Sequence, residues 1–376
     1  HPYPPWCPRF WHGLRFTEWV RLAASHQFRI HPSRWPMAFG VTCVSSICSG
    51  LSVLQKLAWG KKIAETEITH PPVFILGHWR SGTTLLHEYL SLDDQFGFPT
   101  TYQCFAPRHF LVSEWLVARY MQFLVPGKRP MDNMVAGWDR PQEDEFALLT
   151  MGAPTPYLRM AFPNDPPPYM ELLDMIDVSP SVLEQFQSAM LYFMKALTLR
   201  NNKRIMMKSP PHTGRIGLLA KLFPGAKFIH IARNPLEVFA STVRLWQSLD
   251  YVQGLQKPRN EGIEEFVFQC FERMYRGFDQ QVDSVPASDV HHIRYEELVA
   301  DPIGSVEKIY DQLGLGDFSH MRPRLEEYIQ SNKDYQPNKH HALQPIFVNE
   351  IRRRWANYIE RYGYEAEFAA APAGAA

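Results

Sequence analysis

Short apolar runs alternate with longer segments of helical periodicity in the second half of the chain. The runs at 204–209 and 226–232 predict buried strands, and 289–299 predicts a strand that continues into a helix. The helical segments around them are 212–223, 235–249 and 262–285. Such alternation predicts a parallel sheet covered by helices, with ligands bound at the carboxyl ends of its strands.

The first half of the chain adds one strand and several helices. Residues 71–76 are continuously apolar between prolines and a glycine, which predicts a buried strand, and 83–92 predict the helix after it. Longer helices are predicted at 106–125 and 181–200, on either side of a proline-broken region at 126–168. We therefore predict an α/β fold with three layers, in which helices flank a P-loop-like parallel sheet.

The N-terminal residues differ in pattern from the rest. Residues 1–69 predict a helical arm, 70–365 the main domain, and the Ala/Gly-rich residues 366–376 a flexible tail. Residues 35–55 carry no charge and could span a bilayer, but their Ser, Gly, Cys and Thr content favours a helix packed on the protein or resting on a membrane. With the amphipathic residues 11–24, they predict peripheral membrane contact through the arm.

Composition excludes some partners. Of 376 residues, 45% are hydrophobic and 21% charged, and the formal net charge is zero, which argues against a nucleic-acid binder. The five cysteines show neither zinc-ligand spacing nor the even count of a disulfide scaffold. We expect no metal site and a reducing, cytoplasmic setting, with membrane association through the arm. A homodimer is compatible with the sequence, although no feature indicates one.

The loop GHWRSGTT, between the first strand and its helix, has the composition of an anion cradle. Gly77 and Gly82 permit a tight turn, and the hydroxyls of Ser81, Thr83 and Thr84 accompany successive backbone amides. The helix start adds positive potential, so a phosphate is the expected ligand.

This loop departs from the nucleoside-triphosphate loop G-x-x-x-x-G-K-[ST]. The two glycines have the same spacing, but Thr83 replaces the Lys and the cation stands at Arg80. The strand at 226–232 is followed by Arg233 where a magnesium-binding Asp is expected. The loop therefore predicts a phosphate site without metal-bound triphosphate.

Two motifs together resemble the sulfotransferases that use 3′-phosphoadenosine 5′-phosphosulfate (PAPS). Those enzymes carry (Arg/Lys)-Ser-Gly-Thr-Thr after a first strand, and an Arg ending a later strand with a Ser eight residues on. This chain has residues 80–84 in the first pattern, and Arg233 and Ser241 in the second. The resemblance covers roughly 70–365, and the strings GHWRSGTT, PQEDEF and KSPPHTGR are similar to a mostly uncharacterised group of the family.

The resemblance implies roles for individual residues. Arg80 and the loop residues Ser81, Gly82, Thr83 and Thr84 would bind the 5′-phosphosulfate, and Arg233 with Ser241 would bind the 3′-phosphate. Lys208, in a K-x-P element at a strand end, would meet the transferring group, as would Arg80. The resemblance also implies that Tyr295 and Lys339 belong to the donor pocket.

The catalytic base is not fixed by the family pattern, because the Glu that some relatives carry after the first helix has no match. Glu143 and Glu145 in RPQEDEFALL are the leading predictions, although acidic residues are also common in first turns of helices. The histidines that remain as alternatives are His87, His109 and His212.

The sequence thus predicts a sulfotransferase that moves a sulfonate from PAPS to a hydroxyl or amine by in-line transfer and releases the bisphosphate PAP. The acceptor is left open among small metabolites, glycans, protein tyrosine and lipid-like molecules. A P-loop kinase or nucleotidase, and a non-enzymatic membrane-associated protein with a vestigial nucleotide loop, remain alternatives.

Overall fold

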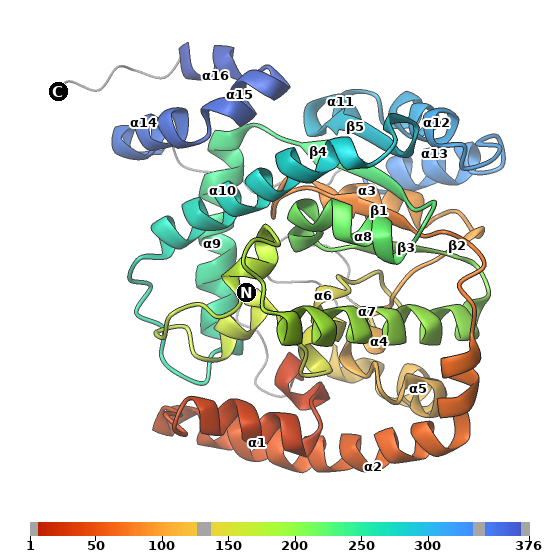
Figure 1. The fold of residues 1–376 in the computed structure, drawn as a ribbon, viewed down its shortest axis with the longest axis vertical. Coiled ribbons are helices and arrows are strands. Elements are labelled where there is room, and N and C mark those ends of the chain that lie inside the picture. Colours follow the sequence, from red (N-terminus) through yellow and green to blue (C-terminus); the bar gives the residue numbers. More distant parts are fainter. Residues whose placement is uncertain (1–6, 126–136, 334–342, 370–376) are drawn as a thin grey trace.

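A parallel β-sheet lies at the centre of the computed structural model, which describes residues 7–125, 137–333 and 343–369 (Figure 1). Within these residues the sheet has five strands in the order β2-β3-β1-β4-β5, and every pairing is parallel. The strands are β1 (Val73–Leu76), β2 (Phe96–Gly97), β3 (Arg204–Lys208), β4 (Lys227–Ala232) and β5 (Val290–Arg294).

Both faces of the sheet are apolar, because every residue of β1 is buried and alternate residues point to opposite sides. Val73 and Ile75 join one hydrophobic cluster, whereas Phe74 and Leu76 join the other. The first cluster is completed by α3 (Thr83–Leu90), α12 (Pro302–Leu313) and α13 (Arg322–Ser331). The second contains α7 (Pro180–Asn201), α8 (Ile216–Leu222) and α10 (Ile263–Gln281). The predicted three-layer α/β fold is confirmed.

The remaining helices extend the second layer and the two ends of the molecule. Their bounds are α1 (Phe16–Ser25), α2 (Trp35–Glu65), α4 (Thr101–Phe105), α5 (Phe110–Tyr120), α6 (Glu145–Thr150), α9 (Pro235–Gln253), α11 (Tyr295–Ala300), α14 (Pro345–Arg354), α15 (Ala356–Tyr362) and α16 (Glu365–Ala369). The single helix predicted over 106–125 begins later, at Phe110, because Ala106 precedes a proline and leaves the helical region (φ −127°, ψ 46°).

Helices α1 and α2 lie along the lower edge of the molecule, away from the sheet (Figure 1). They follow a short 3₁₀ turn, η1 (Phe10–Gly13). The turn contributes Trp11 to the larger core cluster, and the two helices contribute Trp19, Val41 and Ile63. Helix α2 is longer than predicted and continues to Glu65. Among the described residues, Pro32–Glu65 is the one helical stretch long and apolar enough to cross a membrane.

The C-terminal helices α14 to α16 lie at the opposite end of the molecule from α1 and α2 (Figure 1). The predicted tail begins inside α16, where Phe368 is buried, and its residues 370–376 lie outside the described part of the chain.

Candidate active site

The loop between β1 and α3 follows a backbone path that requires glycine at two positions. Gly77 and Gly82 have φ values of +145° and +101°. A Cβ atom at Gly77 would lie 2.6 Å from the carbonyl oxygen of Ile231, and one at Gly82 would lie 2.4 Å from the ring of Tyr295. The loop is therefore pressed against β4 and the start of α11, which fixes its shape.

Side chains of the loop have two different uses. The Ser81 hydroxyl donates to the carbonyl oxygen of His78 at 2.7 Å and is buried, so it holds the turn closed. Thr84 instead faces the neighbouring strand, with its Oγ1 atom 3.5 Å from Nζ of Lys208. Because α3 begins at Thr83, its first amides add positive potential beside this lysine.

Lys208 ends β3 directly beside the loop, since Ile75 of β1 is its register partner. Its side chain is almost fully buried, and Nζ donates to Oε1 of Glu143 at 2.9 Å. The second oxygen of Glu143 accepts a hydrogen bond from the Tyr157 hydroxyl at 2.6 Å, and Trp79 donates to that hydroxyl at 2.8 Å. An ammonium and a carboxylate are thus positioned together at the mouth of the anion cradle.

A second cationic group joins the first loop to the β4–α9 turn. Nε of Arg80 donates to Oγ of Ser241 at 2.8 Å, and Nη1 of Arg233 donates to the backbone carbonyl of Arg80 at 3.0 Å. These contacts connect residues that are more than 150 positions apart in the chain. The two predicted anion-binding motifs therefore form one continuous surface at the strand ends.

The Arg233 guanidinium is held from several sides. It lies 4.1 Å over the ring of Tyr295, and its Nε donates to Glu237 at 3.0 Å. The backbone amide of Arg233 donates to the Tyr358 hydroxyl at 2.8 Å, and that hydroxyl donates to the Arg233 carbonyl at 2.9 Å. Helix α15 thereby fixes the backbone of this arginine.

Three consecutive acidic residues each pair with a basic side chain at the end of β3 or just after it. Glu143 contacts Lys208, Asp144 lies 2.5 Å from Nε2 of His212, and Glu145 pairs with Arg215 at 2.6 Å. The last two pairs are fully buried, and only Glu143 retains some exposure, 13% of its side chain. His212 and Arg215 therefore anchor the start of α6 to the 3₁₀ turn η6 (Pro210–Arg215).

Asp144 and Glu145 are held inside the protein. Burial raises the pKa of the Asp144 carboxyl, but the charge of His212 and hydrogen bonds from His212 and Ser209 outweigh burial and keep that pKa below its ordinary value. Glu145 accepts from both Nη atoms of Arg215 and from the Thr155 hydroxyl. Glu145 therefore forms a fully buried ion pair, and the catalytic role predicted for it stays a prediction.

Comparison with known proteins identifies the family of this chain. A model of the sulfotransferase family matches residues 71–319. Two proteins named omega-hydroxy-beta-dihydromenaquinone-9 sulfotransferase Stf3, from Mycobacterium bovis and Mycobacterium tuberculosis, are each 42% identical over 362 residues, covering 96% of this chain and 92% of theirs. This chain belongs to the sulfotransferase family.

Solved sulfotransferase structures share the fold. STF9 from Mycobacterium avium has a TM-score of 0.62 at 16% identity and covers 88% of this chain and 86% of its own. STF1 from Mycobacterium tuberculosis H37Rv has the same TM-score at 18% identity and covers 91% and 92%. Sulfotransferase membership and fold confirm the predicted reaction class and disfavour the kinase and the vestigial-loop alternatives.

The histidines named as alternative bases in this sulfotransferase are all buried. Burial and the charge of Lys208 lower the pKa of His87 to about 3, and burial lowers that of His109 to about 4. His212 is bound to Asp144. Lys339 lies outside the described residues. Within those residues, no group of three or more His, Cys, Asp or Glu side chains is arranged to hold a metal, and the five cysteines are free.

Three aromatic residues of the sulfotransferase site were not predicted. Tyr157 and Trp79 orient Glu143, and Tyr358 holds Arg233. Trp79 lies inside the quoted loop, so its position offered a signal. Tyr157 and Tyr358 reach the site only through tertiary packing, and no local motif marks them.

Proposed function

We propose that this sulfotransferase takes its sulfonate from PAPS and transfers it to a hydroxyl group of a lipid-like acceptor, with PAP as the second product. The observation that carries this proposal is the 2.8 Å contact between Arg80 and Ser241. It brings the two anion-binding motifs within one surface, as a ligand with phosphate groups at two separated positions requires.

The residues around this contact suit the two ends of an adenosine bisphosphate skeleton. Amides of the first loop, the start of α3, Thr84 and Lys208 would hold the 5′-phosphosulfate. Arg233 and Ser241 would hold the 3′-phosphate, with Tyr295 supporting Arg233 from below. Because the Arg80 side chain contacts Ser241, we propose that Arg80 binds the 3′-phosphate in addition to the 5′-phosphosulfate.

Sulfonate transfer needs an in-line acceptor oxygen and a cation at the leaving oxygen. The acceptor oxygen forms a bond to sulfur while the bond from sulfur to the bridging oxygen of the 5′-phosphate breaks. Lys208 would neutralise the charge that develops on this bridging oxygen. Glu143 would take the proton of the acceptor hydroxyl, since its carboxylate lies 2.9 Å from Lys208 and keeps some solvent exposure.

The proposed acceptor class rests on the relatives. Their name describes an omega-hydroxylated dihydromenaquinone as the molecule that they sulfonate, and the alignment with them covers 96% of this chain. A hydroxylated lipid of that kind is therefore the acceptor that we propose. No metal enters this reaction scheme, because positioning and electrostatics supply its needs.

Donor and acceptor are tested separately. In thermal unfolding, PAP should stabilise the protein by about 2.7 kcal/mol at a hundredfold excess over its dissociation constant, and magnesium-ATP should not. In a transfer assay with labelled PAPS, an omega-hydroxylated menaquinone should become labelled, whereas the same quinone without the hydroxyl should not. Stabilisation by magnesium-ATP alone would contradict the donor assignment, and labelling of both quinones would contradict the acceptor site.

A further inference from the structure

Helix α2 exposes a continuous apolar stripe. Its outward positions recur at helical spacing and include Phe39, Ile47, Val53, Leu54 and Leu57, which are between 56% and 79% exposed. No charged residue occurs between Arg34 and Lys56. Of its most hydrophobic window, whose mean hydropathy is 1.8, only 22% is buried. The stripe therefore presents hydrocarbon to the outside over about six turns.

The opposite face of α2 is fixed to the protein. Its buried positions are Val41, Ser45, Cys48, Ser52, Gln55 and Ile63. Gln55 donates to the Tyr192 hydroxyl at 3.0 Å and accepts from the amide of Leu111 at 2.8 Å. Since one face carries such specific polar contacts, α2 is held against the body of the enzyme, and only its outer face is available to a partner.

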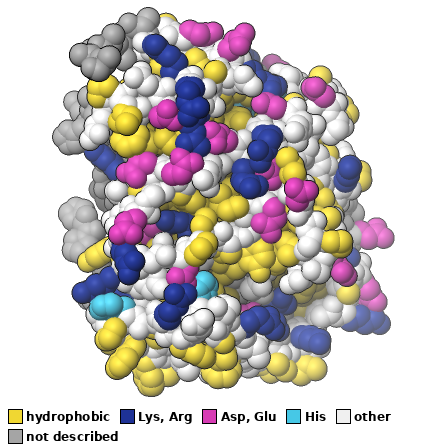
Figure 2. Space-filling view, turned by 60° about the vertical axis from the view of Figure 1, so that its left-hand side comes forward, with side chains coloured by type: hydrophobic (Ala, Val, Ile, Leu, Met, Phe, Trp, Pro, Cys, Tyr) yellow, Lys and Arg dark blue, Asp and Glu magenta, His cyan; other side chains and the backbone are white. Residues whose placement is uncertain are grey.

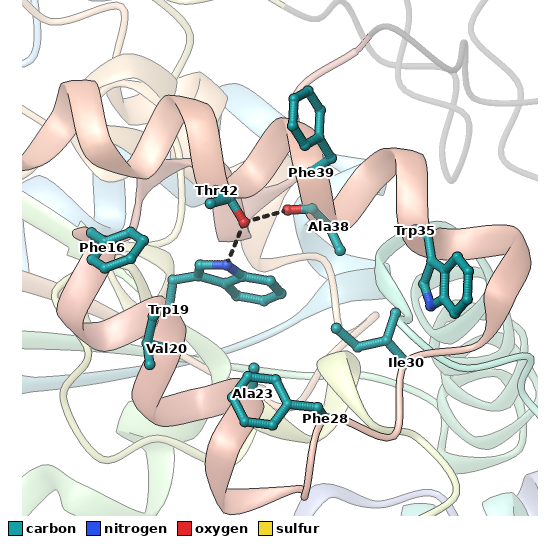
Figure 3. A pocket seen from close by; sticks show the side chains of 10 residues that line it. All are labelled: Phe16, Trp19, Val20, Ala23, Phe28, Ile30, Trp35, Ala38, Phe39 and Thr42. Carbon is teal, nitrogen blue, oxygen red and sulfur yellow. Dashed lines mark hydrogen bonds between the residues drawn. The ribbon is translucent and has the colours of Figure 1, made fainter.

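An apolar cavity opens between α1 and α2 on the same edge (Figure 3). Its volume is about 310 Å³, and the large side chains around it include Phe28, Trp35 and Phe39, which are 60%, 63% and 72% exposed. The Trp19 indole donates to Thr42 at 3.0 Å and Thr42 donates to the Ala38 carbonyl at 2.8 Å, so the polar atoms here are paired and the cavity is left apolar.

The apolar surface is continuous and has cationic ends. Figure 2 shows hydrophobic side chains gathered along the lower edge, the edge formed by α1 and α2 in Figure 1. At the C-terminal end of the stripe the exposed cations are Lys56, Lys61 and Lys62. At the other end Arg29 is more than half exposed, and it pairs with Asp165 at 2.9 Å. An exposed apolar face with cations at its ends suits contact with the interface of a negatively charged bilayer.

We propose that the face formed by α1 and α2 docks on the surface of an anionic lipid bilayer. The α2 stripe enters the boundary between headgroups and acyl chains, the lysines contact acidic headgroups, and the cavity receives a lipid chain. The helix lies along the membrane instead of crossing it, because its inner face is occupied by the enzyme. A second copy of the chain would cover the hydrocarbon but would bring the cationic ends of the two stripes together.

Vesicle flotation with the full chain tests this docking. The wild type should float with vesicles of phosphatidylcholine and phosphatidylglycerol, and the double variant Phe39→Glu/Leu57→Glu should bind them at least about tenfold more weakly. Ile346→Glu is the matched control, because Ile346 is 63% exposed on α14 at the other end of the molecule, and it should bind like the wild type.

The same samples decide the alternatives. PAP-induced thermal stabilisation, measured in each variant, should be unchanged, which shows that the fold and the donor site are intact. Equal flotation of the double variant and the wild type would overturn the proposal. So would a wild type that does not float and is a dimer in solution, with the double variant a monomer, because the face would then be a contact between copies.

Discussion

Nζ of Lys208 and Oε1 of Glu143 lie 2.9 Å apart at the end of β3. In the mechanism that we propose, this pair places the cation for the leaving oxygen next to the carboxylate for the acceptor hydroxyl. Because the two groups are held by different elements, a strand end and the segment before α6, their roles can be separated by substitution.

Lys208→Met should lower kcat by about a hundredfold or more, with little change in donor affinity, because the charge that Lys208 would neutralise develops on the leaving oxygen only in the transition state. Steady-state kinetics with PAPS and PAP titration measure the two effects. Lys227→Met is the control, since Lys227 begins β4 at the far end of the sheet and pairs with Asp289. Unchanged turnover in Lys208→Met would remove this residue from the mechanism.

Glu143→Gln and Glu145→Gln should fail in different ways. Glu143→Gln should lower kcat by about 10²- to 10⁴-fold and should destabilise the protein less than Glu145→Gln, because Glu143 keeps some solvent exposure. Glu145→Gln leaves the buried Arg215 charge without a counterion and should cost about 3–5 kcal/mol of unfolding free energy. Denaturant titration and turnover of both variants check this. Loss of turnover in a fully stable Glu145→Gln variant would support Glu145 as the base that takes the acceptor proton.

Arg233→Gln and Ser241→Ala should weaken binding of PAP without lowering kcat at saturating donor. We expect a larger effect from the arginine, about 2 kcal/mol or roughly thirtyfold in Kd, because it would make charge-assisted hydrogen bonds to a phosphate. Calorimetric titration with PAP measures the loss. Arg353→Gln, at an exposed ion pair with Glu350, should bind PAP like the wild type.

Stability should fall as the pH drops from 6.5 towards 4. Burial lowers the pKa of His12 and His109 to about 4 and that of His78 to about 3, so the unfolded chain binds more protons than the folded one in this window. The stability that each histidine contributes is fully present above pH 6.5. Below that pH the unfolding free energy falls by about 1.4 kcal/mol per pH unit for each histidine, until the pH reaches its folded-state pKa. Urea titrations at about pH 7, 6 and 5 measure the unfolding free energy. In His109→Gln its slope with pH should be smaller than in the wild type by about one proton. An unchanged slope would mean that His109 titrates normally in the folded protein.

The first loop and the layers could be predicted from sequence because their physics is local. Gly77 and Gly82 predict a turn with positive φ, and continuous apolar runs predict buried strands. The partners of Glu143, Asp144 and Glu145 could not be predicted, because three adjacent carboxylates look alike in the sequence until the fold brings the end of β3 and η6 against them. Tyr358 was missed for the same reason, since it meets Arg233 across 125 residues.

That long separation has a consequence for biosynthesis. A nascent chain reaches Arg233 well before Tyr358 is translated, so the backbone of the arginine stays unclamped until α15 has emerged from the ribosome. We therefore expect a fragment that stops before α15 to bind the proposed donor nucleotide more weakly than the full chain, because the backbone of its Arg233 is not held.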